Sequence, residues 1–569
     1  MTDGELIDGE VIARRRERLD RRWGPWEPMT LDQRFDATAA RFAGDRPSVI
    51  TDEHAYTYDE LVEWSRALAR GLVDLGVHPG DRVALLIDNR AEFVATRLAV
   101  SRVGAVAVPL NYQYRQDELL AALEHVRASV LITVARTMAT DFLAALDGIV
   151  PGWEGGVRNA RLPFLHHVVL VDAVRPGATD LAELARRGGR VPESALRELA
   201  AQADPDAVGD IVFTSGTSGR PLAAELTHDG VLRSAYGGAY HRGYDDGWRI
   251  CFALPMYHVF GYIEAFVASI FVGGAIIPRQ VFNPVTMLEA IERHRASELF
   301  AVPTMTVALV DQAARGSYDL SSLDSVVSAA APSPAWLWER VMKEFHPRML
   351  YTGYGQTEVS AGTAMTSAGD PIEVVAETVG RPKLGGVAAP DDMNGVLAEY
   401  RTVDPFTGQP LPAGEPGELS VRGPIVTRAY HNDPEHTARM IQDGWLRSGD
   451  LGWIDDQGYL HLTGRARELF KCGGENVAPK EIEDLLTRLP GVGQAYVAGV
   501  PDERMGEVGW AWVVPDGTAD LDPRELIRYC RAHLAPFKVP RRIIFIEAAD
   551  LPMTSTGKVQ KHVLVASAL

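Results

Sequence analysis

Short apolar runs alternate with longer amphipathic stretches in the first part of the chain. Residues 58–75 and 90–103 place apolar side chains at the spacing of one helix face, and each stretch predicts an α-helix. The short runs are rich in Val, Leu, Ile and Ala, and each predicts a buried strand. Strands that alternate with helices in this way predict parallel sheets covered on both faces. The predicted strands are residues 82–87, 105–109, 130–134 and 167–171.

The pattern changes near residue 400. From 401 to 463 the chain is punctuated by Gly and Pro and predicts short strands. The C-terminal part predicts a compact α+β unit, because two longer apolar runs precede an amphipathic helix. The predicted strands are 417–423, 452–454, 459–462, 494–500 and 510–514, and the helix is 523–534.

Three other stretches add to this picture. Residues 12–22 are basic and mostly polar, and they predict a terminal helix exposed to solvent. Residues 266–277 are apolar but too short to span a bilayer. The first six residues are acidic and lack the apolar segment of a signal peptide.

Composition narrows the class of protein. The 569 residues exceed what one hydrophobic core supports, so two or more domains are expected. A net charge of −19 argues against nucleic acid and anionic membranes as partners, because both attract basic surfaces. Cys251, Cys472 and Cys530 have neither disulfide nor metal-ligand spacing. We therefore expect a cytoplasmic protein without a membrane span.

The most distinctive stretch is residues 211–222, where an apolar strand leads into a loop of Thr, Ser and Gly. Gly216 and Gly219 allow the backbone to approach a ligand closely. Hydroxyl and N–H groups in such a loop can surround an anion, but no lysine stands at the spacing of a P-loop. The residues alone leave two interpretations open, a phosphate loop and a polar surface turn. The candidate ligands are Thr214, Ser215, Gly216, Thr217, Ser218 and Gly219.

This loop resembles the phosphate loop of the adenylate-forming superfamily of acyl-CoA synthetases, peptide synthetase adenylation domains and luciferases. The family loop usually continues with lysine and glycine, where this chain has Leu222 and Ala223. The resemblance implies an α/β fold with a large N-terminal domain, residues 1–466, made of two α/β sheet subdomains and a distorted β-barrel. A small, mobile α+β domain, residues 467–569, is implied to follow.

Residues 350–358 hold the most specific local match to this family, which is complete from Tyr354 to Glu358. Gly353 and Gly355 keep the loop thin, and Tyr354 offers a flat face to adenine. Glu358 is a hard oxygen ligand suited to Mg²⁺. The resemblance implies catalytic roles for Thr357 and Glu358. It also assigns Gln356 to the nucleotide, together with Ala330, Ala331 and Pro332 in a small-residue loop that could equally be a plain turn.

Residues 251–261 resemble the family element that lies beside the acyl pocket. A histidine in an apolar stretch is more often structural than catalytic, and the resemblance gives His258 a gating or packing role. Gly261 is implied to let the acyl chain pass close to the backbone. No acidic residue stands between 253 and 261 to bind an ammonium group, which favours a simple carboxylic acid. The implied substrate-binding residues are Tyr257, His258, Phe260, Gly261, Ala329, Tyr351 and Gly353, and they favour an aryl, fatty or polycyclic acid.

The last third of the chain supplies the remaining implied residues. Asp450 matches the family's ribose ligand, although an Asp at a turn is often only a local cap. Arg465 is implied to reach the ribose or the α-phosphate. Lys558 matches the lysine that meets the substrate carboxylate and the α-phosphate, although such a lysine is usually solvated. The residues implied in domain movement and the thioester step are Arg467, Lys471, Gly473 and Gly474.

The resemblance implies a two-step ligation that uses ATP, Mg²⁺ and coenzyme A. A small carboxylic acid attacks the α-phosphate of ATP, and a thiol then displaces AMP from the acyl-adenylate. The attacking carboxylate is already ionised, so catalysis is mainly positioning and charge neutralisation. Leu222 removes one cation near the β- and γ-phosphates, which is expected to weaken ATP binding unless Arg220 compensates.

Three alternatives stay open at this point. An acyl carrier protein could be the acceptor in place of coenzyme A. The enzyme could specialise in one half-reaction. A non-catalytic nucleotide-binding protein would be expected to lack Lys558 or Glu358, and both are present. No pattern in the sequence indicates an oligomeric state.

Overall fold

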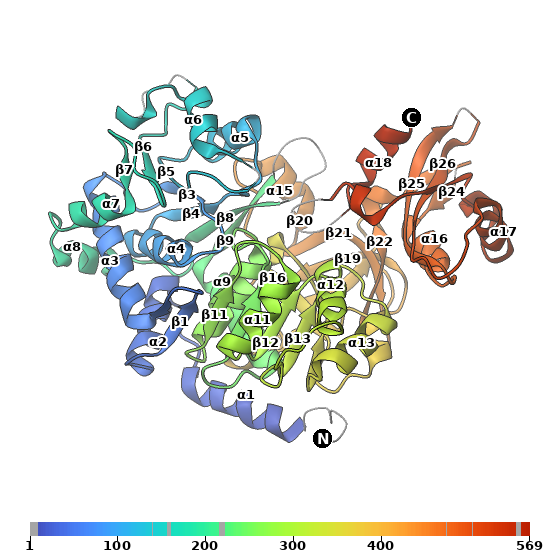
Figure 1. The fold of residues 1–569 in the computed structure, drawn as a ribbon, viewed down its shortest axis with the longest axis horizontal. Helices are drawn as coiled ribbons and strands as arrows, with labels where there is room; N and C mark the ends of the chain where they lie inside the picture. Colours follow the sequence, from blue (N-terminus) through green and yellow to red (C-terminus); the bar gives the residue numbers. More distant parts are fainter. Residues whose placement is uncertain are drawn as a thin grey trace. The chain divides into compact units, whose positions relative to one another are not determined.

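The computed structural model describes residues 9–138, 140–155, 161–214, 222–473, 475–502, 504–553 and 559–569 (Figure 1). The chain forms two compact units. The large unit is Met1–Glu399 with Arg422–Gly444, and the small unit is Tyr400–Val421 with Trp445–Leu569. The predicted domain boundary after residue 466 is the point about which the C-terminal domain is expected to move. The two compact units are defined by packing, so this boundary stays a prediction.

Two seven-stranded sheets lie in the large unit, and their mostly parallel strands agree with the alternating pattern, while the resemblance implied that there are two of them. In the first sheet the strand order is β7-β6-β5-β3-β4-β8-β9. Its pairs are parallel except for the antiparallel hairpin β8–β9. The strands are β3 (Arg82–Leu86), β4 (Val106–Pro109), β5 (Val130–Thr133), β6 (His167–Leu170), β7 (Thr179–Asp180), β8 (Val208–Thr214) and β9 (Leu222–Thr227).

The second sheet has the order β14-β13-β12-β10-β11-β1-β2, and only β1–β2 is antiparallel. Its hydrophobic core includes Met287 and Leu288 of α11, Leu309 of α12 and Trp338 of α13. These buried faces explain why the strands are apolar along their whole length. The strands are β1 (Pro47–Ile50), β2 (Ala55–Thr57), β10 (Arg249–Phe252), β11 (Ala275–Pro278), β12 (Glu298–Ala301), β13 (Ser325–Ser328) and β14 (Met349–Tyr351).

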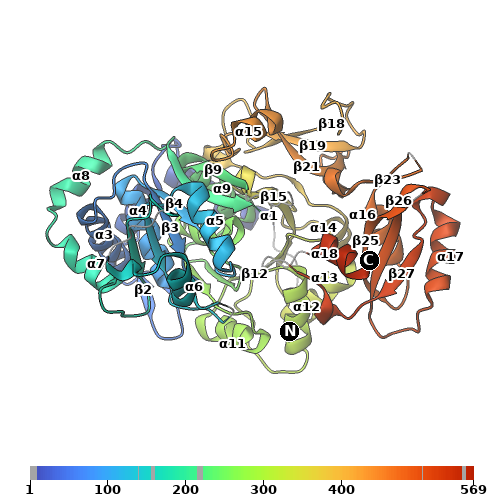
Figure 2. The same cartoon turned by 90° about the horizontal axis from the view of Figure 1, so that it is seen from above.

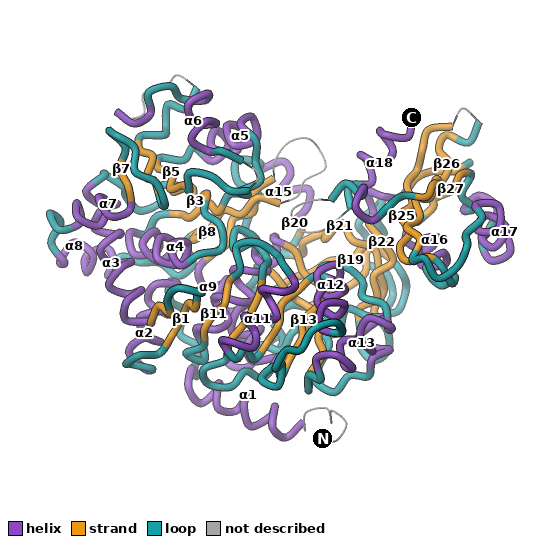
Figure 3. The backbone as a smooth tube through the Cα atoms, viewed as in Figure 1, coloured by secondary structure: helices purple, strands orange, loops and turns teal. Residues whose placement is uncertain are grey.

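Helices connect these strands and cover them (Figure 3). Helix α4 (Ala91–Val103) is buried over nearly its whole circumference, and its two buried arginines, Arg97 and Arg102, are paired with Asp210 and Asp36. The other helices are α2 (Leu31–Arg41), α3 (Tyr58–Asp74), α5 (Gln116–Val126), α6 (Phe142–Ile149), α7 (Leu181–Gly188), α8 (Glu193–Ala201), α9 (His228–Arg242), α10 (Ala268–Ile270), α11 (Pro284–His294), α12 (Pro303–Ala313) and α13 (Ala335–Phe345), and the short η1 (Trp153–Gly155) is a 3-10 turn.

The rest of the large unit carries a three-stranded antiparallel sheet, β15-β16-β17. A π-helix, η2, precedes it in the chain and follows the segment predicted to line the acyl pocket. π-Helical turns are rare and recur at functional sites. The elements are η2 (Phe260–Val267), β15 (Gly353–Gln356), η3 (Thr357–Val359), β16 (Ala361–Met365), α14 (Ile372–Glu377), β17 (Arg381–Pro382), η4 (Gly386–Ala388), α15 (Pro434–Met440) and β20 (Ile441–Gln442).

The small unit begins with antiparallel strands in the region where Gly and Pro punctuate the sequence. They match the predicted β-rich subdomain, and together with the two α/β sheets they confirm the predicted fold class. The strands are β18 (Glu399–Val403), β19 (Gly417–Arg422), β21 (Trp445–Ile454) and β22 (Leu460–Arg465).

A second sheet, β24-β23-β26-β25 with β27 beside β26, forms the C-terminal part of the small unit. Side chains alternate along β26: Ala511 and Val513 face a core with α16 and α17, and Trp512 and Val514 face another with α18. Helices α17 and α18 accordingly lie on opposite sides of these strands (Figure 2). The elements are η5 (Ala466–Glu468), β23 (Phe470–Cys472), β24 (Glu475–Val477), α16 (Pro479–Leu486), β25 (Val492–Asp502), β26 (Gly506–Pro515), α17 (Pro523–His533), η6 (Pro536–Lys538), β27 (Arg542–Phe545), η7 (Ala548–Asp550) and α18 (Lys561–Ala568).

The N-terminal helix α1 (Gly9–Trp23) corrects the expectation of a solvated helix. One face is buried, because Leu19 is 1% exposed and Trp23 donates from Nε1 to the carbonyl of Phe271 at 2.9 Å. A basic residue of the helix also contacts the rest of the large unit: Arg15 donates to the carbonyl of Gly243 at 3.2 Å. The wrong prediction came from weighting the arginines over the apolar positions that share a helix face.

Shortening Leu19 tests this docking. Leu19→Ala is expected to lower the free energy of unfolding by about 2–4 kcal/mol, because it leaves a cavity under a buried helix. Arg14→Ala on the exposed face of the same helix is the matched control and should change it by less than about 0.5 kcal/mol. Urea unfolding followed by fluorescence measures both. Equal, small effects of the two substitutions would contradict the docked helix.

Candidate active site

The predicted phosphate loop lies at the tip of a hairpin. Strand β8 ends at Thr214, which pairs with Leu222, the first residue of β9. Residues 215–221 connect the two strands and lie outside the described residues. The hairpin holds the two ends of the loop together, and the phosphate contacts of the loop stay a prediction. The predicted ligands inside it are Ser215, Gly216, Thr217, Ser218 and Gly219.

The β15–β16 hairpin carries the most specific predicted motif. A Cβ atom on Gly355 would lie 1.9 Å from the carbonyl oxygen of Ala361, so no side chain fits there. On Gly353 a Cβ atom would lie 2.9 Å from the carbonyl oxygen of Ala364. Tyr354 pairs with Ala364 and is 8% exposed. The opposite strand therefore requires the thin loop that the sequence predicts.

Thr357 and Glu358 are both buried in the short helix η3. The carboxylate of Glu358 accepts a hydrogen bond at Oε1 from the hydroxyl of Tyr430, at 3.1 Å. Its backbone carbonyl accepts another from the amide of Thr427, at 2.6 Å. Burial and the Glu358 carboxylate raise the pKa of Tyr430, so its proton stays in place near neutral pH. This geometry orients the carboxylate predicted to hold Mg²⁺.

The sequence analysis did not identify Tyr430. It lies in a segment that runs along the edge of β9, where the amide of Glu225 donates to the carbonyl of Ala429 at 3.0 Å. The amide of His431 donates to the carbonyl of Ala223 at 2.7 Å. Because this pairing joins residues about 200 positions apart, no local pattern could have placed Tyr430 beside Glu358.

The predicted adenine loop follows β13. Ala330 has a φ of +72°, a conformation that L-residues other than Gly, Asn and Asp rarely adopt. Ala329 is buried, whereas Ala330, Ala331 and Pro332 are exposed. A strained, exposed backbone at this position fits a binding loop better than a plain turn.

The predicted acyl segment is packed tightly. A Cβ atom on Gly261 would lie 2.7 Å from the carbonyl oxygen of Pro255, so the fold itself requires this glycine. His258 accepts a hydrogen bond at Nδ1 from the amide of Phe260 at 3.2 Å, which fits the predicted packing role. Tyr257 packs edge-on against Tyr112 at 4.9 Å between ring centroids. Acyl contacts of these residues stay predictions.

The contacts of Tyr351 are with the core of the large unit. The side chain is fully buried, and its hydroxyl donates to the carbonyl of Arg242 at 3.3 Å. The neighbouring Thr352 donates from its amide to the hydroxyl of Thr366 at 3.0 Å. These contacts fix the strand end that leads into Gly353.

In the small unit, Asp450 and Arg465 face each other across β21 and β22. Arg465 Nε lies 3.2 Å from Asp450 Oδ1. Strand β21 is irregular just before Asp450: Gly449 has a φ of +74° at a register shift against β19, and its amide donates to Glu418 at 3.0 Å. The two residues predicted to bind the ribose are thus brought together, and the arginine orients the carboxylate.

The C-terminal predictions are described only in part. Gly473 has a φ of +63° and its amide donates to the carbonyl of Met505 at 2.8 Å, in keeping with the predicted turn. Lys471 is exposed on β23. Gly474, Lys558 and the side chain of Arg467 lie outside the described residues.

One contact in the small unit was not predicted. Lys561 at the start of α18 lies 2.6 Å from Glu468 and 2.7 Å from Glu483. Despite burial, these two carboxylates raise the pKa of Lys561. The pair with Glu483 ties α18 to α16, and the pair with Glu468 ties it to η5, the short helix that contains the predicted hinge residue Arg467.

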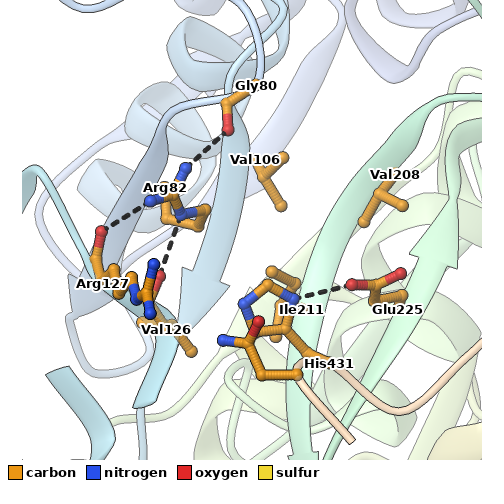
Figure 4. Close-up of a pocket in the computed structure, with 10 residues that line it drawn as sticks. Gly80, Arg82, Val106, Val126, Arg127, Val208, Ile211, Glu225 and His431 are labelled. Atoms are coloured by element: carbon orange, nitrogen blue, oxygen red, sulfur yellow. Dashed lines mark hydrogen bonds and ion pairs between the residues drawn. The ribbon is translucent and has the colours of Figure 1, made fainter. Parts of the chain in front are cut away.

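A pocket of about 320 Å³ opens beside the base of β8 in the large unit (Figure 4). Its polar wall includes Arg82, whose guanidinium donates to backbone carbonyls of Gly80, Val126 and Arg127. Across the pocket, His431 lies 2.7 Å from Glu225. No predicted site residue lines this pocket, and the guanidinium of Arg82 is engaged in hydrogen bonds to the backbone.

The described residues contain no group of three or more His, Cys, Asp or Glu side chains that could hold a metal ion by themselves. The assignment of Glu358 as a single carboxylate ligand of Mg²⁺ stays a prediction. No helix among the described residues is long and apolar enough to cross a membrane.

Comparison with known families decides the identity. The AMP-binding enzyme family matches residues 35–431, and its C-terminal domain matches residues 481–558. The chain belongs to the AMP-binding enzyme family. Both predictions made from the resemblance, the adenylate-forming superfamily and its fold, are confirmed.

Relatives and solved structures agree with this family assignment. A methyl-dioxo-octahydro-indenyl-propanoyl:CoA ligase of Mycobacterium tuberculosis is 36% identical, over 94% of this chain and 97% of its own. A feruloyl-CoA synthase of Amycolatopsis sp. is 33% identical, over 95% and 97%. The structure of the anthranilate CoA ligase AuaEII with anthranoyl-AMP has a TM-score of 0.79 and 25% identity, and covers 95% of this chain and 98% of its own. These findings confirm an AMP-forming acid–CoA ligase that uses ATP, Mg²⁺ and coenzyme A.

Replacing Tyr430 by Phe tests its role beside Glu358. The substitution removes one hydroxyl and is expected to slow acid-dependent ATP–pyrophosphate exchange about tenfold, because partners that orient a metal-binding carboxylate contribute on this scale. Tyr58→Phe is the matched control, since its buried hydroxyl donates to the carbonyl of Gly274 at 2.7 Å, away from Glu358. The control should lower stability by about 1 kcal/mol and leave the exchange rate unchanged. Equal exchange rates in the two variants would contradict the assigned role.

Proposed function

We propose that this enzyme activates an apolar, ring-bearing or fatty carboxylic acid as its acyl-adenylate and transfers the acyl group to coenzyme A. The substrate class is inferred from the lack of acidic residues in the predicted acyl segment. Residues 253–261 contain no acid, and the first acidic residue after them is Glu264. The relatives act on ring-bearing acyl groups by name, which supports the same class.

Glu264 is not available to bind an ammonium group. It is 1% exposed, and its two carboxylate oxygens accept from Lys383 at 2.6 Å and from Arg242 at 2.7 Å. A substrate amine would have to displace one of two buried cations. This argues against an amino acid substrate and for a simple carboxylic acid.

The residue roles follow from the family and from the geometry within each unit. In the large unit, the 214–219 loop binds the β- and γ-phosphates and Tyr354 stacks on adenine. Thr357 contacts a phosphate or carboxylate oxygen, and the site is completed by residues that line the nucleotide or the acyl group: Gln356, Ala329, Ala330, Ala331, Pro332, Tyr257, His258, Phe260, Gly261, Tyr351 and Gly353. Glu358 would hold Mg²⁺, which neutralises phosphate charge when bound.

In the small unit, Asp450 accepts the ribose hydroxyls and Arg465 orients that carboxylate. Lys558 neutralises charge on the substrate carboxylate and the α-phosphate. No general base is required for adenylation, because the acid is ionised before it attacks. For the thioester step, residues 467–569 move about Arg467 and bring Lys471, Gly473 and Gly474 to the adenylate.

Two further aspects complete the proposal. The acceptor is coenzyme A, with an acyl carrier protein as the alternative that the test below separates. The compartment is the cytoplasm, which the free, buried thiols of Cys251, Cys472 and Cys530 support.

The first experiment measures AMP formation from ATP over a panel of aryl, fatty, polycyclic and amino acids, with and without coenzyme A. We expect AMP and acyl-CoA with at least one apolar acid and none with amino acids. Adenylate that accumulates unchanged by coenzyme A would point to a carrier-protein acceptor or a single half-reaction. Activation of amino acids in preference to apolar acids would contradict the proposed substrate class.

Leu222→Lys tests the missing phosphate-loop cation. One charge-assisted contact contributes about 1.5–3 kcal/mol, so the variant is expected to lower the KM for ATP about tenfold. Leu222→Met, which keeps the size without the charge, is the control and should leave the KM for ATP unchanged. Initial rates at a saturating concentration of the acid measure both. An unchanged KM in the lysine variant would show that the site does not need this cation.

A further inference from the structure

A cluster of charged side chains is buried in the large unit behind the β15–β16 hairpin. Arg242 and Lys383 are fully buried, as is Glu298, and Glu264 is 1% exposed. Two cations therefore balance two carboxylates without solvent. Burial opposes ionisation of Glu264, yet the attraction of Lys383 and Arg242 outweighs it and lowers the pKa of that carboxyl. Burial lowers the pKa of Lys383 and raises that of Glu298.

The cluster holds the turn that follows Glu358. This turn has two consecutive non-glycine residues in the left-handed region, Ser360 with a φ of +52° and Ala361 with a φ of +88°. Such a conformation persists only where its surroundings enforce it. Ser234 donates from its hydroxyl to the carbonyl of Ser360 at 2.6 Å, and Glu264 accepts from the amide of Gly362 at 3.2 Å.

Lys383 connects these two contacts. Its Nζ donates to Glu264 Oε1 at 2.6 Å and to the carbonyl of Ser234 at 2.9 Å, and it lies 3.2 Å from the Ser234 hydroxyl. One ammonium group thus fixes both the carboxylate and the hydroxyl that clamp the strained turn. No other described side chain spans the two contacts.

The same carboxylate fixes the other side of the predicted site. Glu264 lies on the π-helix η2, which also carries Phe260 and Gly261. Arg242 donates to its carboxylate at 2.7 Å and to its backbone carbonyl at 2.9 Å. Glu264 therefore contacts the turn after Glu358 and belongs to the helix that begins at the predicted acyl pocket.

We propose that Lys383 and Glu264 are positioning residues for adenylation: they hold the strained turn after Glu358 and set it against the acyl helix η2. The proposal rests on the proposed function, in which Glu358 serves adenylation. Burying ion pairs is seldom the most stable choice for a core, and apolar replacements of similar size are often as stable. The cluster is therefore kept for geometry more than for stability.

Lys383→Met tests the proposal, because it keeps the length of the side chain and removes the ammonium group. With the acid found by the panel, it is expected to lower kcat/KM for ATP in adenylation at least about tenfold, since a displacement of about 1 Å costs on the order of 100-fold. Thioester formation from supplied acyl-adenylate should stay within about twofold of wild type. Adding Ala361→Gly should recover much of the lost adenylation, because glycine adopts positive φ without a clamp.

Controls separate this role from general destabilisation. Arg102→Met removes a buried cation that pairs with Asp36, and it should lower the melting temperature without changing kcat/KM for ATP. Ser234→Ala removes only the clamp on Ser360 and should reproduce the selective loss at smaller size. If Lys383→Met does not fold, Ser234→Ala tests by itself whether loss of the contact to Ser360 impairs adenylation.

The outcomes are distinct. Selective loss of adenylation with recovery by Ala361→Gly supports the proposal. Unchanged adenylation, equal loss of both half-reactions, or no recovery overturns it. Glu358→Gln tests the function on which the proposal rests: normal adenylation in that variant would reject the role of Glu358, whereas impaired adenylation there beside normal Lys383→Met would reject only the positioning role.

Discussion

The buried carboxylate of Glu264 fixes the geometry of the large unit behind the predicted site. An unpaired charge at this depth would cost several kcal/mol, so the chain must bring cations to both of its oxygens. They come from the end of α9 and from the residue after β17. The amide of Gly362 adds a third contact. Four segments far apart in sequence are thereby held in one geometry, and the turn after Glu358 is among them.

Local sequence patterns predicted strands β3, β4, β5, β6 and β8 of the first α/β sheet, because burial on both faces makes each strand an unbroken apolar run. They did not identify the strands of the second sheet. The resemblance to the family, not a local pattern, located the motif in β15 and η3 and the residues Asp450 and Arg465. Local patterns could not find Tyr430 or Lys383, whose roles come from pairing with residues 72 and 119 positions away. The N-terminal helix was assigned to solvent because its arginines outnumber its apolar residues, although Leu19 and Trp23 share the buried face.

In the small unit, the sequence positions of Asp450 and Arg465 did not reveal that the two side chains contact each other. Asp450 and Arg465 were each expected to contact the ribose, but strand register sets them opposite each other, and the arginine lies 3.2 Å from the carboxylate. A ribose that binds Asp450 must share it with this guanidinium. The pairing orients the carboxylate before the nucleotide arrives, which lowers the entropy lost on binding.

Two positions of the predicted nucleotide site hold a strained backbone. Ala330 and Ala361 both hold positive φ, one in the predicted adenine loop and the other in the turn after Glu358. Each costs about 1–2 kcal/mol that a glycine would avoid. The surrounding contacts must therefore hold each alanine in place. At Ala361 these contacts come from Ser234 and Glu264, which bind the residues on either side of it.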